Sequence, residues 1–72
     1  MTPTEVGWLW NWADDEEAVA PNDKQAEPYR KVKNLCKQHA EKMVEYFSLG
    51  GEQFAPEQRA WRFVHNGLKG KP

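Results

Sequence analysis

The chain has 72 residues, of which 39% are hydrophobic, and its formal net charge is −1. A chain of this length forms one domain at most and buries only about 60% of the surface that its unfolded form exposes. These properties exclude most enzymes with a deep pocket, any two-domain machine and any membrane span. They assign no function, but they predict a single domain over residues 1–72 with a thin core that depends on its aromatic residues or on a partner.

Charge is distributed unevenly along the sequence. Residues 1–27 hold seven acidic residues and one lysine, whereas residues 28–72 hold nine basic and four acidic residues. Three arrangements fit this pattern: the acidic segment folds back on the basic part of its own chain, the two halves pair between subunits, or each half faces its own partner. An exposed ion pair contributes only ~0–1 kcal/mol, so charge alone does not choose among the three.

The first predicted helix covers residues 3–13. Thr2 is a good N-cap, Pro3 suits the first helical position, and Glu5 lies three residues after the cap, which together form a capping box. The acidic residues at 14–17 would oppose the negative end of the helix dipole, so we expect the helix to end near Ala13. Asp14 could instead cap a short further turn.

The second predicted helix is central and covers residues 28–48, or begins one turn earlier. A polar segment over residues 20–27 predicts a linker before it, and Gly50 and Gly51 predict its end. Its basic and polar residues, Lys33 among them, are expected on the solvent side. Apolar residues recur at helical spacing on one face, comprising Tyr29, Val32, Cys36, His39, Ala40, Met43 and Phe47, with Leu35 and Tyr46 widening the stripe.

The third predicted helix covers residues 56–66, with Gly67 at its C-terminal cap. Its expected core stripe consists of Ala60, Trp61, Val64 and Leu68, and residues 68–72 form a short basic tail that we expect to fray. Three helices with short connections, and no alternating pattern typical of strands, predict an all-α fold. We expect a small three-helix domain built around a long central amphipathic helix.

Three tryptophans in five residues, Trp8, Trp10 and Trp12, are the densest signal in the sequence. On a helix, Trp10 shares a face with Val6, Leu9 and Ala13, while Trp8 and Trp12 lie nearly opposite. Either all three rings fill the core, or Trp10 packs inward while Trp8 and Trp12 anchor a partner. In the second case a charged rim would attract a basic partner, and its residues would be Asp14, Asp15, Glu16 and Glu17.

Other combinations of reactive residues are weak. The acidic run lacks the spacing of a calcium-binding loop, although beside aromatic rings it could imitate a nucleic-acid strand. Cys36 and His39 are three residues apart, but the sequence offers neither the further ligands that zinc needs nor the third group of a catalytic set. We therefore expect no catalytic residue, no metal and no cofactor.

Basic residues on the second and third helices suggest an alternative. They could bind phosphates of a nucleic acid, although the connection over residues 48–56 is longer than the tight turn of a helix-turn-helix motif. The residues concerned are Arg30, Lys33, Lys37, Arg59 and Arg62.

The leading expectation is a small non-enzymatic protein-binding module that acts as an inhibitor, adaptor or regulator, of the kind that phages and mobile elements often encode. Its partner would be a larger protein with a basic-rimmed apolar groove, and a homodimer is possible. A nucleic-acid-binding regulator and a homo-oligomeric structural protein are the alternatives. One cysteine and no signal-peptide pattern favour the cytoplasm, and we expect no membrane partner.

Overall fold

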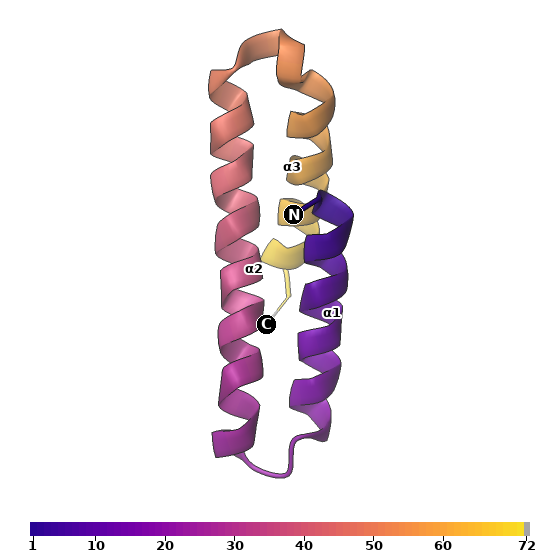
Figure 1. Cartoon of the computed structure of the whole chain (residues 1–72), viewed down its shortest axis with the longest axis vertical. Helices are drawn as coiled ribbons and strands as arrows, with labels where there is room; N and C mark the ends of the chain where they lie inside the picture. Colours follow the sequence, from indigo (N-terminus) through magenta and orange to yellow (C-terminus); the bar gives the residue numbers. More distant parts are fainter. Residues whose placement is uncertain (72) are drawn as a thin grey trace.

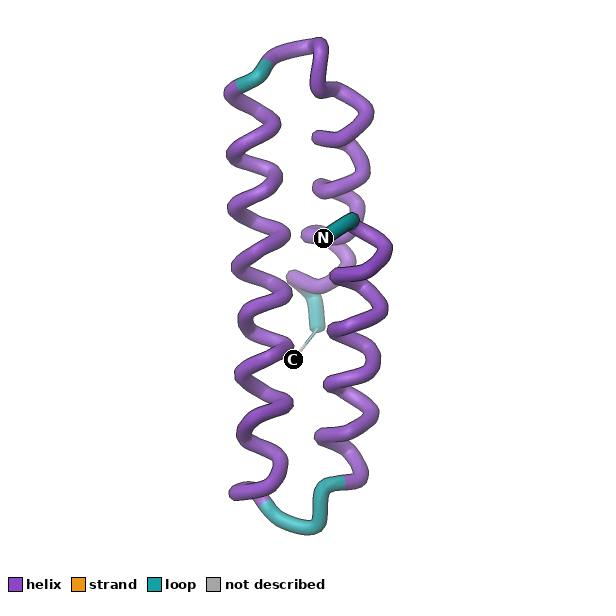
Figure 2. Tube along the Cα trace, in the orientation of Figure 1, coloured by secondary structure: helices purple, strands orange, loops and turns teal. Residues whose placement is uncertain are grey.

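The computed structural model describes residues 1–71 as a helical protein. Its elements in chain order are α1 (Pro3–Val19), α2 (Asp23–Leu49), the short 3-10 helix η1 (Gly51–Phe54) and α3 (Ala55–Lys69). Within the described residues there are helices and loops but no strand (Figure 2). The predicted all-α fold, with three helices built around a long central one, is confirmed.

Helix α2 runs the length of the molecule, and the two other helices run antiparallel to it (Figure 1). Helix α1 lies beside the N-terminal half of α2, and α3 lies beside its C-terminal half, so the start of α1 and the end of α3 meet near the middle of α2 (Figure 1). The Cα trace measures 47 × 20 × 15 Å. The protein is therefore three helices thick only around its centre, and two helices thick towards either end.

The capping box at the start of α1 forms as predicted. The Thr2 hydroxyl accepts a hydrogen bond from the Glu5 amide at 3.2 Å, and the Thr2 amide donates to Glu5 Oε1 at 2.9 Å. The hydrogen bond from the Thr2 amide favours the ionised carboxylate and lowers the pKa of Glu5. The predicted end near Ala13 is wrong, because α1 continues to Val19. Basic residues of α2 neutralise part of the acidic segment, as described below.

Helix α2 begins at Asp23, five residues before the predicted start at Pro28. The Asn22 side chain accepts a hydrogen bond from the Gln25 amide at 2.9 Å and so caps the helix. The predicted linker over residues 20–27 shrinks to residues 20–22 as a result. Pro28 is exposed and lies within the helix, where it removes one backbone hydrogen bond.

The C-terminal helix is longer than predicted at both ends. It spans Ala55–Lys69, so Gly67 lies inside the helix and not at its cap. Leu68 is buried, and the Lys71 amide donates to the Leu68 carbonyl at 3.0 Å, so the predicted fraying tail is ordered up to Lys71. Burial of Leu68 against the core explains this extension. The last residue of the predicted tail, Pro72, lies outside the described residues.

The core is centred where the three helices overlap, a region we call the waist. Its buried residues are Val6, Trp10, Cys36, Ala40, Trp61 and Leu68. The predicted inward face of α1 and the apolar stripe of α2 are confirmed at these positions. Leu35, Tyr46 and Ala60 were expected to join the core but are exposed, because no third helix covers the sides of α2 and α3 that carry them.

Candidate protein-binding surface

The helical period separates the three clustered tryptophans into two environments. Trp10 is 2% exposed and belongs to the waist, whereas Trp8 is 68% exposed and Trp12 is 51% exposed. Helices α2 and α3 pack on the side of α1 that carries Trp10, and the opposite side remains open. Of the two arrangements that the sequence allowed, the structure has the one with Trp10 inside and the two other rings outside.

Helix α2 supports one of the two exposed rings. Trp12 makes an edge-on contact with Tyr29, with 5.6 Å between the ring centroids and 77° between the ring planes. This contact restricts the rotamers of Trp12 before any partner arrives. A pre-ordered ring loses less conformational entropy on binding than a free one, which favours its use as an anchor.

The four acidic residues of the predicted rim divide into two pairs. Asp14 and Glu17 turn towards α2 and bind its basic side chains. Asp15 is exposed and Glu16 is half-buried, and both follow Trp12 by about one helical turn. The candidate surface, which we call the α1 face, therefore consists of Trp8, Trp12, Asp15 and Glu16.

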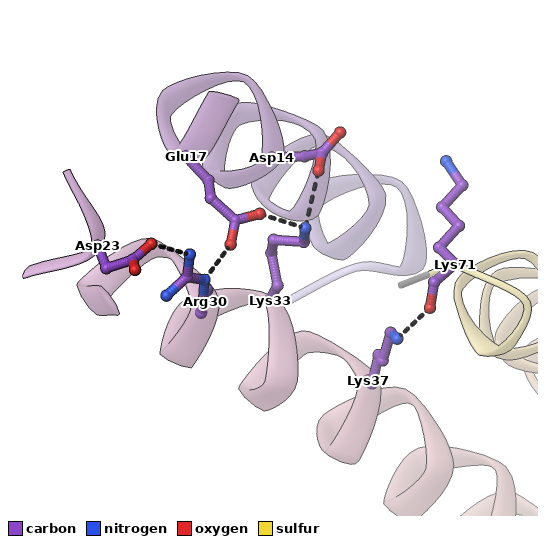
Figure 3. Close-up of polar contacts among 7 residues, drawn as sticks. All are labelled: Asp14, Glu17, Asp23, Arg30, Lys33, Lys37 and Lys71. Atoms are coloured by element: carbon purple, nitrogen blue, oxygen red, sulfur yellow. Dashed lines mark hydrogen bonds and ion pairs between the residues drawn. The ribbon is translucent and has the colours of Figure 1, made fainter. Parts of the chain in front are cut away.

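Lys33 is the residue that binds the inward pair, and it is only 6% exposed. Its ammonium group lies 2.7 Å from Asp14 Oδ1 and 2.8 Å from Glu17 Oε1 (Figure 3). The same group lies 4.7 Å from the centroid of the Trp10 ring. Burial alone would lower the pKa of Lys33, but the hydrogen bonds that its ammonium group donates to the two carboxylates more than offset this effect and raise the pKa. The prediction that Lys33 faces solvent is wrong.

Arg30 extends this network by one turn of α2. Its guanidinium contacts Glu17 Oε2 at 2.7 Å and Asp23 Oδ1 at 3.1 Å (Figure 3). The hydrogen bond from Lys33, reinforced by Arg30, lowers the pKa of Glu17. The acidic segment thus folds back on the basic helix of the same chain, which is the first of the three arrangements that the charge distribution allowed.

The basic residues proposed for nucleic-acid binding do not form one patch of uncommitted charge. Arg30 and Lys33 bind carboxylates of α1, and Lys37 donates a hydrogen bond to the Lys71 carbonyl. Arg59 and Arg62 lie exposed on α3. The three bases of α2 already have partners within the chain, so a phosphate would have to displace these.

Sequence analysis did not predict a groove of about 430 Å³ between α1 and α2. Most of its lining is apolar, with Leu35, 62% exposed, at the rim and Lys42 as its one lining lysine. Two apolar residues could have indicated the groove. Leu9 lies to one side of the buried residues of α1, and Leu35 lies to one side of the buried residues of α2. The main apolar lining residues are Met1, Leu9, Val32 and Leu35.

The described chain offers little for other kinds of chemistry. Within residues 1–71, no three His, Cys, Asp or Glu side chains are placed to hold a metal ion. Cys36 is buried, and its burial raises the pKa of the thiol and so disfavours the reactive thiolate. Of the helices between residues 1 and 71, none is both long and apolar enough to cross a membrane.

No protein-family model, curated protein or solved structure matches this chain. Its function is therefore argued from the chemistry of its own surface.

Proposed function

We propose that this chain is a small non-enzymatic protein-binding module of the cytoplasm, which acts as an inhibitor, adaptor or regulator through the α1 face. The observation that carries this proposal is the exposure of Trp8 and Trp12 after folding, while Trp10 on the same helix is buried. A thin-cored domain that leaves two indoles in water loses burial that would stabilise it. A partner that covers them recovers that burial.

The two exposed rings are large enough to contribute substantial affinity. An aromatic side chain can bury roughly 150–250 Å², so the exposed parts of Trp8 and Trp12 together offer roughly 180–300 Å². At ~25 cal/mol per Å², covering them contributes about 4.5–7.5 kcal/mol before the entropic cost of association. Tryptophan is enriched among the few interface residues that dominate binding for this reason.

The charges beside the rings indicate the chemistry of the partner. Helix α1 contains no basic residue, and Asp15 and Glu16 lie next to the aromatic pair. Arginine or lysine on the partner could pair with these carboxylates and lie over an indole ring in a cation–π contact. We therefore propose a partner protein whose apolar groove has a basic rim.

The test is capture of partners from a lysate by the tagged chain, with and without nuclease. We expect a stoichiometric protein partner that survives nuclease and is lost with Trp8→Ala/Trp12→Ala. The variant must keep its helicity by circular dichroism, since both rings are exposed. Phe63→Ala is the matched control, because Phe63 is also exposed but lies on α3, and it should keep the partner. Loss of the fold in the double variant would show that the rings support the core and would refute the proposal.

Nucleic-acid binding through α2 and α3 has weaker support, because Arg30, Lys33 and Lys37 have partners within the chain. It makes a distinct prediction in the same experiment. Captured proteins would disappear on nuclease treatment, and binding to a nucleic acid would fall steeply with salt as counterions compete for the phosphates. Affinity that is unchanged between low and moderate salt would eliminate it.

A further inference from the structure

The groove between α1 and α2 has the chemistry that the α1 face requires of its partner. Its walls are mainly apolar, with Leu35 at the rim and Lys42 in the lining. Lys31 lies one turn before Leu35 on the same side of α2, is exposed, and forms only a solvent-exposed pair with Glu27 at 3.6 Å. The chain therefore carries, beside its acidic aromatic face, an apolar groove with one lysine in its lining and a second lysine one turn from Leu35.

Two stripes with the same spacing contribute to the lining of this groove, through Leu9 on α1 and through Leu35, Gln38 and Lys42 on α2. Each stripe begins and ends with a charged residue, and these two residues are eleven positions apart. Between them lie two uncharged residues, four and seven positions after the first. On α1 the stripe is Glu5, Leu9, Trp12 and Glu16, and on α2 it is Lys31, Leu35, Gln38 and Lys42. The charged ends are acidic on α1 and basic on α2, so the two stripes complement each other in charge and length.

The ion pairs on the inner side show how far acidic side chains of α1 and basic side chains of α2 reach along the molecule. Glu17 meets Arg30 and Asp14 meets Lys33, and the residue numbers of both pairs have the same sum in this antiparallel arrangement. The same sum relates Glu5 to Lys42 and Glu16 to Lys31, and Trp12 and Leu35 lie between the ends of their stripes. Rotation about a two-fold axis parallel to the helices does not change the position of any residue along the helices. Such an axis can therefore place α1 of one copy against α2 of the other with these residues still paired.

The molecule also exposes enough extra surface for such a contact. Its accessible surface is 5212 Å², whereas a compact protein of 8.4 kDa exposes roughly 4,600 Å². The excess of roughly 600 Å² is most of the ~800 Å² that each partner contributes to a standard protein interface. Two copies packed on their groove sides would form an antiparallel four-helix arrangement. In each copy, the section where only α1 and α2 pack together would then be covered by the other copy.

We infer that the chain forms a two-fold symmetric dimer in which the α1 stripe of each copy covers the α2 stripe of the other. This inference rests on the proposed function, because it identifies the protein bound by α1 as a second copy of the chain. Leu35 and Trp12 lie at the centre of the contact, and the Glu5–Lys42 and Glu16–Lys31 pairs lie at its two ends. Symmetry makes each of these contacts occur twice.

The first test is the concentration dependence of the molecular mass, measured by sedimentation equilibrium. We expect a monomer–dimer equilibrium that Leu35→Glu weakens by about a hundredfold or more, because it places two charges in the apolar centre of the interface. Leu49→Glu is the matched control: Leu49 is also exposed and lies on α2, but it is distant from the groove, so dimerisation should not change. A chain that stays monomeric up to millimolar concentration, or a dimer that tolerates Leu35→Glu, would overturn the inference.

A charge exchange tests the pairing itself. Glu16→Lys and Lys31→Glu should each weaken self-association by about tenfold, since each creates two like-charge contacts in the symmetric dimer. An equimolar mixture of the two variants should dimerise more tightly than either variant alone, because each copy then meets its opposite. If mixing does not restore dimerisation, the proposed alignment is wrong. Circular dichroism of each variant confirms that its helices are intact.

Failure of this inference is distinguishable from failure of the proposed function. If the chain is monomeric but Trp8→Ala/Trp12→Ala abolishes capture of another protein, the dimer is refuted and the binding role of the α1 face remains. If the double variant leaves both dimerisation and capture unchanged, the α1 face binds nothing and both proposals fall.

Discussion

Lys33 joins the acidic and basic parts of the chain at a single buried point. Its ammonium group is satisfied by Asp14 and Glu17, and it lies over the Trp10 ring. The two carboxylates are partly exposed, at 45% for Asp14 and 21% for Glu17, so removing the ammonium group costs less than breaking a fully buried pair but more than breaking an exposed one. Lys33 therefore stabilises the fold, although its residue type suggested a solvent-exposed role.

We predict that Lys33→Ala lowers the free energy of unfolding by about 2–4 kcal/mol, because it removes both the ion pairs and the buried stem. Lys33→Met also removes the ion pairs but keeps a stem of similar length against Trp10, so it should lose less than Lys33→Ala. Urea denaturation followed by circular dichroism measures both. Equal losses in the two variants would mean that the stem contributes nothing and that the charge carries the whole effect.

Glu17 should make the fold sensitive to acid. Its pKa in the folded chain is lowered below the ordinary value of 4.5 by Lys33 and Arg30, so the unfolded chain takes up the proton first as the pH falls. The stabilisation is complete well above pH 4.5 and disappears as the pH falls through the lower folded pKa. In Glu17→Gln the thermal midpoint should change less between about pH 6 and about pH 3 than in the wild type.

Thermal unfolding at a series of pH values provides the measurement. Glu57→Gln is the control, because Glu57 is an exposed carboxylate on α3, outside the Lys33 network. It should reproduce the wild-type pH profile. A Glu17→Gln profile as steep as that of the wild type would show that other carboxylates cause the acid sensitivity.

At the scale of the elements, two glycines differ in whether their backbone conformation allows a side chain. Gly51 has a φ of +75°, in the left-handed region, and it turns the chain from α2 into α3. Gly67 lies inside α3, where an added Cβ would meet nothing within 4 Å. The first glycine is required by its conformation, and the second only weakens its helix.

We predict that Gly67→Ala raises the free energy of unfolding by about 0.5–1 kcal/mol, because it reduces the backbone entropy lost on helix formation. Gly51→Ala should lower the free energy by about 1–2 kcal/mol, since alanine is strained at positive φ. Chemical denaturation of the two variants provides the comparison. A stabilising Gly51→Ala would contradict the turn geometry.

The sequence predicts the helices and the first capping box better than the other helix ends. The capping box at Thr2 and the apolar stripe around Cys36 and Ala40 depend on local spacing, so they could be recognised without a structure. The continuation of α1 past Ala13 depends on bases of α2 that lie sixteen or more residues away in the chain from Asp14, and no local rule contains them. Lys33 does lie on the apolar stripe, three residues before Cys36, but its charge argued against burial.

The candidate site shows the same division. The opposite orientations of Trp10 and the pair Trp8 and Trp12 follow from the helical period alone. The sequence left open whether the side of α1 that carries Trp8 and Trp12 is covered as well, because that depends on how much of α1 the other helices enclose. The groove beside Leu35 was missed for a similar reason: a side chain that widens an apolar stripe is buried only where a third helix covers it.

At the scale of the whole molecule, thickness should control local stability. The waist has three helices in contact, whereas the connection at residues 20–22 and the turn at Gly51 lie at the thinner ends (Figure 1). Fewer buried contacts mean that smaller free energies open the backbone locally.

We predict that amide hydrogen exchange is slowest around the buried residues of the waist and becomes faster along α2 towards both of its ends. Native-state exchange followed by nuclear magnetic resonance resolves this profile residue by residue. It should be recorded in dilute solution, so that any self-association does not add protection. Uniform protection along α2 would show that the molecule opens only as a whole.

The length of α2 has a consequence for how the protein folds. Helices α1 and α2 form one helical hairpin and α2 and α3 form another, and the two hairpins share α2 but turn at opposite ends of the molecule. Trp10 from one hairpin and Trp61 from the other enter the same cluster at the middle of α2. The two hairpins therefore unfold together only while α2 remains one unbroken helix at its midpoint, because that segment belongs to both of them. A proline introduced there would uncouple the hairpins and replace a single transition with two.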